Sequence, residues 1–477
     1  MDELFAQLRK VVGDNHFLND AASLHAYESD ALTLFRGRGS CIVIPGSREE
    51  VVACVKLFHA ASVPFVARGA GTGLSGGAVV APGGAILAMS RMRKVIEVHP
   101  EEHWALVEPG VINAKLSELV APYGLCFAPD PSSQKVCTLG GNVAENAGGP
   151  HCFLHGMTAQ HVRFCEVVLP DGRIESWGCR SGGDSDLDLR GFLLGSEGTL
   201  GVIVAIGVRL MPVAEDAFTV LAAYHSLLEA CEATTEIVAA GLQPAAMEVM
   251  DQNTIKAVED SVYRCGLPTE AGAVLLVELE GPRRVMERDG KELVDLLKSR
   301  QLMKLDVATS PTQRAALWKG RKGAGGALGR QAPDSYVMDG VVPRSRLVEI
   351  MSFVEEVQAA SGLKVANLFH AGDGNIHPHF SYDARNPEQS ALVEKCGAQI
   401  LERCLELGGS LSGEHGIGLE KEHLLSKQFS AATLKIMERV RRVFNPDDLL
   451  NPGRGLPLSR GCAEAFRRHR GVDPSQA

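Results

Sequence analysis

Three histidines lie within ten residues of one another, at His370, His377 and His379. The apolar run before His370 predicts a strand, Asp373-Gly374 predicts a tight turn, and the chain from Ile376 onward predicts a returning strand. Such a hairpin brings His370 and His377 close together across the strand pair, and the alternation of side chains puts His377 and His379 on one face.

Two imidazoles and one carboxylate are a common ligand set for an open metal site. Glu414, beside His415 in the segment SGEHGIG, offers that carboxylate. Zinc, manganese and iron all accept nitrogen and oxygen ligands, so the set alone leaves the metal open. Taken alone, His370 is better interpreted as a hydrogen-bonded structural histidine, and the combination with His377 and Glu414 reverses that interpretation. The same ligand set would also serve a metal-dependent hydrolase, which would leave the glycine-rich loops described next without a purpose.

Glycine is unusually frequent, with 51 in 477 residues, and much of the excess is clustered. The loop RGAGTGLSGG, residues 68–77, follows a predicted strand and could turn consecutive backbone N–H groups toward a phosphate. No Gly-Lys-Ser/Thr follows, which excludes a Walker loop. The pattern GxGxxG occurs at Gly71, Gly73 and Gly76, but no helix follows it, so a Rossmann motif is not indicated. Taken alone, this loop could also be a flexible turn.

Two more segments of small and amide residues lie in the same half of the chain. The first spans 130–149 and contains DPSS, TLGGN and NAGG; the second is GSEGTLG at 195–201. Segments of this kind let the backbone approach a planar polar ring closely. Three such loops in one half of the chain are hard to explain by packing alone.

The composition excludes several classes of function. The formal net charge is −10 and aromatic residues make up only 5%, which argues against a nucleic-acid partner. No apolar run approaches the roughly 20 residues of a transmembrane helix, and the first residues do not resemble a signal peptide, so we expect a cytoplasmic protein. The 12 cysteines form no CxxC pair or iron–sulfur spacing, which indicates reduced thiols in the core.

The elements that must position these residues fall into two halves. Residues 1–40 predict an N-terminal helical segment, and the next residues predict a βαβ opening in which Ser47 caps the helix. A hairpin turning at Asp171-Gly172 and a strand at 202–210 close the first half. After about residue 215, long helical patterns alternate with strands at 246–250, 273–280, 336–342 and 364–369, which predicts a sheet covered on one face. From 457 the chain reads as a polar tail.

The ordered motifs resemble a known family. ARGAGTGLSGGAV, PDPSSQKVCTLGGNVAENAGG and GSEGTLGVI resemble the FAD-binding domain of the vanillyl-alcohol oxidase / p-cresol methylhydroxylase superfamily. FHAGDGNIHPHF, SGEHGIG and FNPDDLLNPG resemble the C-terminal domain of FAD-linked oxidases, a group that includes the D-type subunit of glycolate oxidase, D-lactate dehydrogenases and D-2-hydroxyglutarate dehydrogenase. LWKGRKGAGGALGR and MDGVVPR are most similar to the D-type subunit of bacterial glycolate oxidases.

The resemblance implies an α+β fold. A two-subdomain PCMH-type FAD-binding domain would span 41–215. An α+β substrate cap domain with a ferredoxin-like sheet and a helical C-terminal segment would span 216–456. It implies dissociable FAD, since the glycine loop lacks the histidine that attaches flavin in some relatives. We assign His151 and His155 to an exposed loop rather than to the flavin. The implied FAD-binding residues are Arg68, Gly69, Ala70, Gly71, Thr72, Gly73, Ser75, Gly76, Pro131, Ser132, Thr138, Gly141, Asn142, Asn146, Gly148, Glu197, Gly198 and Ile203.

By the same resemblance, His370, His377 and Glu414 correspond to ligands of a divalent metal, and His415 to the general base. Arg321 matches a position that holds the substrate carboxylate. Lys322 and His379 are weaker candidates for substrate binding, whereas Asp373 and Asn375 are expected to form the turn or to orient the imidazoles.

The expected reaction is oxidation of a small 2-hydroxy acid, glycolate or D-lactate. A D-2-hydroxyglutarate dehydrogenase is the alternative, but relatives of that type carry a lysine where this chain has Val337-Met338-Asp339.

The resemblance also implies partners. In glycolate oxidase relatives these are a second flavin subunit and an iron–sulfur subunit, which would place the chain peripherally at the inner face of a membrane. A non-catalytic flavin subunit is a further alternative, against which the complete histidine and glutamate set argues.

Overall fold

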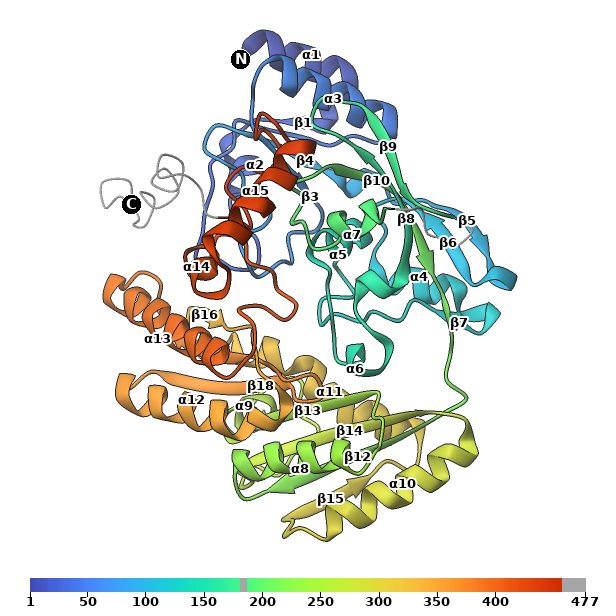
Figure 1. Cartoon of the computed structure of the whole chain (residues 1–477), viewed down its shortest axis with the longest axis vertical. Helices are drawn as coiled ribbons and strands as arrows, with labels where there is room; N and C mark the ends of the chain where they lie inside the picture. The colour runs from blue at the N-terminus through green and yellow to red at the C-terminus, as the bar shows by residue number, and fades with distance from the viewer. Residues whose placement is uncertain (181–186, 457–477) are drawn as a thin grey trace. The chain divides into compact units, whose positions relative to one another are not determined.

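The computed structural model describes residues 1–180 and 187–456, so the expected polar tail lies outside the described residues. Contacts divide the chain into two compact units (Figure 1). Of the described residues, the first unit contains 1–148, 156–180, 187–213 and 414–456, and the second contains 149–155 and 214–413. This division differs from the expected domain boundaries in two places. The short segment 149–155 belongs to the second unit, and the chain returns to the first unit at Glu414.

The first unit begins with a sheet in the order β1-β2-β4-β3, in which β2, β4 and β3 are parallel. Its strands are β1 (Phe17–Leu18), β2 (Cys41–Val43), β3 (Phe65–Arg68) and β4 (Ala85–Ala88). Helices α1 (Asp2–Val12) and α3 (Arg48–Ala60) bury apolar residues in the same core as this sheet. As predicted, the Ser47 side chain caps α3 by accepting a hydrogen bond from the Glu50 amide.

A five-stranded antiparallel sheet in the order β5-β6-β10-β8-β9 forms the rest of the first unit's framework. The predicted hairpin is confirmed as β8–β9. The strands are β5 (Val95–His99), β6 (Trp104–Val107), β8 (Val162–Val168), β9 (Ile174–Gly178) and β10 (Val202–Arg209), and β7 (Leu125–Cys126) pairs separately with β11 (Met211–Pro212). The helices are α2 (Ala21–Ala26), α4 (Asn113–Val120), α5 (Leu139–Glu145), α7 (Leu189–Leu193), α14 (Leu425–Gln428) and α15 (Ala431–Phe444).

The second unit is built on one sheet in the order β15-β12-β14-β13-β18-β19-β17, joined at β18 by β20 and β16. Its strands are β12 (Asp216–Tyr224), β13 (Ala246–Asp251), β14 (Ala273–Gly281), β15 (Lys304–Val307), β16 (Asp334–Val337), β17 (Gly340–Val341), β18 (Lys364–His370), β19 (Asn375–Ile376) and β20 (Pro378–Tyr382). Its helices are α6 (Cys152–His155), α8 (Leu227–Ala239), α9 (Gln252–Glu259), α10 (Arg283–Lys298), α11 (Pro311–Leu328), α12 (Leu347–Ser361) and α13 (Pro387–Glu406).

Helices pack on both faces of this sheet, so the expectation of a sheet covered on one face is wrong. Leu221 and Ala223 of β12 share a core with residues of α9 and α11. Phe218 has the opposite parity along β12 and lies against Gly290 of α10. The strands are therefore buried on both faces, which explains their nearly continuous apolar sequence.

The single strand predicted at 336–342 is also wrong, because the chain forms two strands, β16 and β17, with Met338 and Asp339 between them. β16 pairs with β20, whereas β17 pairs with β19. Among the described residues, no helix is long and apolar enough to cross a membrane. The cysteines of the described part of the chain are all free, as expected.

Candidate active site

Two of the predicted site residues, His370 and Arg321, lie on the face of the second sheet that α9 and α11 cover. Glu248 of β13 lies directly opposite His370 of β18 in the antiparallel pairing. Side chains alternate along a strand, so Glu248 and His370 point to the same face of the sheet as the apolar core residues two positions away on their own strands. From α11, Arg314, Trp318 and Arg321 face the same sheet, because residues three or four apart lie on one side of a helix.

Glu248 is completely buried and joins two of the predicted site residues. One carboxylate oxygen lies 2.7 Å from Nδ1 of His370. The other accepts a hydrogen bond from Nε of Arg321 at 2.6 Å and forms an ion pair with its Nη2 at 2.5 Å. Burial alone would raise the pKa of Glu248, but the charges of Arg321 and His370 and their hydrogen bonds lower it below its ordinary value. Glu248 is therefore an anion in the folded protein.

His370 and His377 are held in the orientation that metal-binding histidines require. Nδ1 of His370 donates to the Glu248 carboxylate, and Nδ1 of His377 donates to the carbonyl of Met338 at 2.9 Å. These acceptors fix the proton on Nδ1 in the neutral rings, so each Nε2 carries the lone pair. The two ring centroids are 5.1 Å apart, and both rings are buried. This pair fits a divalent metal, and the predicted proximity of the two histidines is confirmed.

The segment that carries Glu414 and His415 is tied to the second unit just before those residues. The Gly413 amide donates to the Asp339 carboxylate at 3.1 Å, and the Ser412 hydroxyl donates to the same carboxylate at 2.5 Å. Glu414 and His415 follow Gly413 directly, so their Cα atoms lie within about 4 and 8 Å of it.

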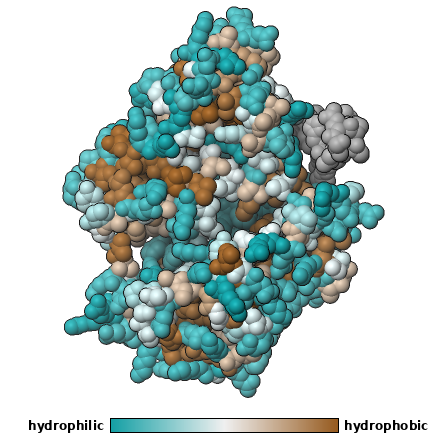
Figure 2. Space-filling view, turned by 180° about the vertical axis from the view of Figure 1, so that it is seen from behind, coloured by the Kyte–Doolittle hydropathy of each residue, from teal (hydrophilic) through white to brown (hydrophobic). Residues whose placement is uncertain are grey.

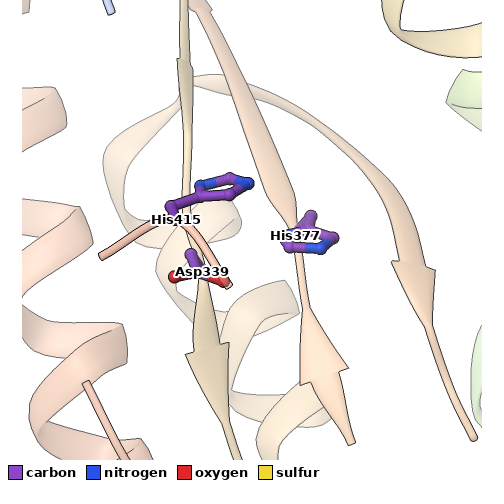
Figure 3. A group of neighbouring side chains, drawn as sticks. All are labelled: Asp339, His377 and His415. Carbon is purple, nitrogen blue, oxygen red and sulfur yellow. The ribbon is translucent and has the colours of Figure 1, made fainter. Parts of the chain in front are cut away.

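Two overlapping groups of possible ligand atoms result, each with all atoms within 4.8 Å of one another. One consists of His370, His377 and Glu414. The other consists of Asp339, His377 and His415, which Figure 3 shows as neighbouring side chains.

The remaining predicted residues of this site differ in their placement. Lys322 is exposed, and its Nζ lies 5.3 Å from the centroid of the Trp318 ring, so it is not buried beside Arg321. His379 is buried in β20 opposite Ala366 of β18. Asp373 accepts a hydrogen bond from the amide of buried Asn375, as expected of a turn residue.

The expectation that His151 and His155 lie in an exposed loop is wrong. His151 and His155 lie 3.2 and 3.1 Å from carboxylate oxygens of Glu278 and Glu280, and their side chains are only 13% and 21% exposed. Glu278 also accepts hydrogen bonds from Arg314, Trp318 and Thr219. Although burial alone would raise the pKa of Glu278, these donors lower it. The two histidines anchor the segment 149–155 to the second sheet.

In the first unit, the predicted phosphate loop follows β3 without a helix, as expected. Gly71 and Gly76 have φ of +71° and +80°, which side chains rarely adopt. A Cβ at Gly69 would collide with the hydroxyl of Thr138, which caps α5. The loop is thus packed closely against the second predicted cofactor segment. Arg68 donates hydrogen bonds from the two Nη atoms of its guanidinium to the carbonyls of Tyr27, Ser29 and Ala78.

The other predicted cofactor residues also lie in the first unit. The loop after β3 contains Ala70, Thr72, Gly73 and Ser75. Around α5 lie Pro131 and Ser132 before the helix, Gly141 and Asn142 within it, and Asn146 and Gly148 after it. The turn before β10 contains Gly198, and β10 itself contains Ile203.

Two carboxylates stand close to these loops. Glu197 is buried and accepts hydrogen bonds from the amides of Ile417 at 2.7 Å and Gly418 at 2.8 Å. Burial raises the pKa of Glu197. The pKa of Glu145 is raised well above its ordinary value, first by burial and then by the negative charge of Glu197. A Cβ at Gly77 or at Gly416 would come within 2.6 or 2.7 Å of the Glu145 carboxylate, so Glu145 lies between the glycine loop and the SGEHGIG segment.

Several buried polar atoms along these loops lack a partner within the described residues, namely Oδ2 of Asp30, Oγ of Ser75 and Oε2 of Glu145. Buried polar atoms in proteins are nearly always hydrogen-bonded. Together with loops that only glycine can form, they fit a polar cofactor such as FAD.

The sequence analysis did not predict that the C-terminal motif FNPDDLLNPG supports the cradle formed by these cofactor loops. Asn451 donates to the carbonyls of Gly77 and Glu197, and Arg454 donates to those of Gly76 and Val79. The motif FNPDDLLNPG was available as a signal, but nothing in it reveals what its amides bind.

Comparison with known proteins agrees with this geometry. The profile of the "FAD binding domain" family matches residues 39–178, and that of the "FAD linked oxidases, C-terminal domain" family matches residues 213–454. The chain belongs to the FAD-linked oxidases. This places it among FAD-dependent oxidoreductases.

Relatives of this FAD-linked oxidase cover nearly its whole length. It is 40% identical to the glycolate oxidase subunit GlcD of Escherichia coli K12, over 97% of this chain and 92% of the relative. It is 30% identical to a D-lactate dehydrogenase of Anaerostipes hadrus, over 94% and 95% of the two chains. Among solved structures, p-cresol methylhydroxylase shares the fold with a TM-score of 0.81 at 16% identity, covering 95% of this chain and 96% of that one.

Proposed function

We propose that this FAD-linked oxidase oxidises a small 2-hydroxy acid, glycolate or D-lactate, to the corresponding 2-oxo acid. The observation that carries the proposal is the pair of buried histidines with both Nδ1 atoms held, beside a buried arginine. Such a site suits an α-hydroxy carboxylate, which offers two oxygens to a metal and a negative charge to a guanidinium. The names of the relatives supply the two substrates.

The residues take the following roles. Arg321 binds the substrate carboxylate through the Nη1 side of its guanidinium, because Glu248 occupies the Nε–Nη2 side. His370, His377 and Glu414 hold a divalent metal, which, when bound, lowers the pKa of the substrate hydroxyl. His415 accepts the hydroxyl proton, as a neutral imidazole can near pH 7. FAD held by the loops of the first unit would take the hydride from Cα.

The chain must pass these electrons on, and we propose that they go to a partner protein or carrier. The first unit exposes large apolar side chains, among them Ile96, Leu119 and Tyr123. Figure 2 shows hydrophobic residues gathered in areas of one face of the molecule. Exposed apolar areas of this kind are typical of protein interaction sites. The E. coli relative is named as a subunit, which also supports the proposal of a partner protein.

The test is the visible spectrum of the purified, FAD-loaded chain without oxygen. Glycolate, D-lactate, L-lactate and D-2-hydroxyglutarate are added in turn, before and after removal of metal by a chelator and again after Zn²⁺ or Mn²⁺ is returned. We expect glycolate or D-lactate to bleach the flavin, the chelator to stop the bleaching, and the metal to restore it. A chain that only D-2-hydroxyglutarate reduces, or that none of the acids reduces, would contradict the proposed substrate.

A further inference from the structure

Glu248 stands between the two parts of the proposed substrate site. Its first oxygen binds His370 and its second binds Arg321, and the residue is fully buried. We infer that Glu248 is the positioning residue of this site: one carboxylate fixes both the imidazole that ligates the metal and the guanidinium that binds the substrate carboxylate. The inference rests on the proposed function.

A comparison within the same sheet shows why Glu248 is more than a structural ion pair. Glu278 of β14 is also fully buried and also binds an arginine of α11, Arg314. Its oxygens are occupied by further donors from Thr219, Trp318 and His151, so that cluster is satisfied internally. Within the described residues, the donors that contact Glu248 are His370 and Arg321, and each contacts the carboxylate through one side of its planar group, so the opposite side faces away from it.

A substrate complex needs the sides of His370 and Arg321 that face away from Glu248. When Nδ1 of His370 donates to Glu248, Nε2 is left as the ligand atom, and the negative charge makes that nitrogen a better ligand. When Arg321 binds Glu248 through Nε and Nη2, the Nη1 side is left for the substrate. Because the same carboxylate holds both groups, a change at Glu248 must affect metal affinity and substrate affinity together.

The substitution Glu248→Gln separates this role from packing. The amide has nearly the same shape, but it has one acceptor oxygen and one donor nitrogen, whereas His370 and Arg321 are both donors. Either one of the two loses its partner, or His370 moves its proton to Nε2, the atom that would ligate the metal. We expect the affinity for Zn²⁺ or Mn²⁺ to fall about 10- to 100-fold, as is usual when the carboxylate behind a metal-binding histidine is removed. We also expect KM for the hydroxy acid to rise.

The matched control is Glu278→Gln, which removes the charge of an equally buried glutamate on the neighbouring strand. Metal affinity is measured on the FAD-loaded full chain by competition between the protein and a chromophoric chelator for Zn²⁺ and for Mn²⁺. We expect Glu278→Gln to lower the melting temperature but to keep the metal affinity of the wild type. Arg321→Met should raise KM while metal affinity stays within a few-fold, because Glu248 still holds His370.

The outcomes separate the inference from the function on which it rests. A wild-type chain that binds neither ion contradicts the proposed metal site itself. A wild-type chain that binds metal, with Glu248→Gln binding it equally well, overturns the role of Glu248 alone. If Glu248→Gln does not fold, the double variant Glu248→Met, Arg321→Met is measured, since replacing both charges leaves no unpaired ion in the core. Metal affinity equal to that of Arg321→Met in this variant would also overturn the inference.

Discussion

Asn451 offers the sharpest test of how the C-terminal motif supports the flavin loops. Its Nδ2 donates to the Gly77 carbonyl at 2.9 Å and to the Glu197 carbonyl at 2.7 Å, and the residue is 2% exposed. Asn451→Ala would leave two buried carbonyls without these donors, at a cost of about 1–3 kcal/mol each. The backbone has φ of +45°, a left-handed conformation that costs alanine about 1 kcal/mol more. The expected loss for the first unit is therefore about 3–7 kcal/mol.

The assay is urea unfolding followed by flavin fluorescence, which increases when FAD is released from the first unit. Asn451→Ala should release FAD at a clearly lower urea concentration than the wild type. Asn451→Gly loses the same hydrogen bonds but tolerates the positive φ, so it should fall between the two. Asn253→Ala is the matched control, because Asn253 donates to a single carbonyl, that of Val365, in the second unit. Release of FAD from Asn451→Ala at the wild-type urea concentration would refute the assignment of this motif to the cradle.

Three further predictions address the base, the glycine loop and a buried acid. His415→Ala should slow bleaching of the flavin by glycolate or D-lactate about 100-fold or more while FAD and metal content stay unchanged. The rate is measured by stopped-flow absorbance, and a wild-type rate would exclude His415 as the base. Gly69→Ala should lower the ratio of FAD to protein because its Cβ collides with Thr138, whereas Gly325→Ala, which meets nothing within 4 Å, should leave the ratio unchanged. Burial raises the pKa of Asp30 from 3.8 to about 6, so its contribution to stability is present below pH 4 and is lost as the pH rises through 6. Asp30→Asn should therefore be more stable than the wild type at pH 8, by up to about 3 kcal/mol, and thermal unfolding that shows no growth of this difference between pH 4 and pH 8 would contradict it.

Local sequence patterns predicted the parts of the site that depend on neighbouring residues. The Asp373-Gly374 turn was sufficient to bring His370 and His377 together, because a tight turn fixes the register of the strands beside it. The glycine loop after β3 could also be predicted from its sequence, since glycine readily adopts the positive φ angles found at Gly71 and Gly76. These predictions needed no knowledge of distant contacts.

The parts that were missed depend on pairings across long stretches of chain. Glu248 lies 122 residues before His370, and its strand reads AMEVMD, in which a single acid gives no hint of its partners. Asn451 reaches Gly77 across 374 residues. The histidines at 151 and 155 were misplaced for the same reason, because their glutamate partners follow more than 120 residues later. Strand register decides the contact between Glu248 and His370, and packing between distant segments decides the other two.

The break between β16 and β17 shows how the fold itself creates the site. A continuous strand at 336–342 would have used its backbone groups in one ladder. Instead β16 pairs with β20 and β17 pairs with β19, and Met338 and Asp339 lie between the two strands, with the Met338 amide hydrogen-bonded to the carbonyl of Pro378. The carbonyl of Met338 then accepts the hydrogen bond from His377, and the buried carboxylate of Asp339 accepts the Gly413 amide. Two adjacent residues thus position a histidine on one side and the segment that leads to Glu414 and His415 on the other. A substitution that restored regular pairing here would disrupt the proposed metal site while leaving every proposed ligand in the sequence.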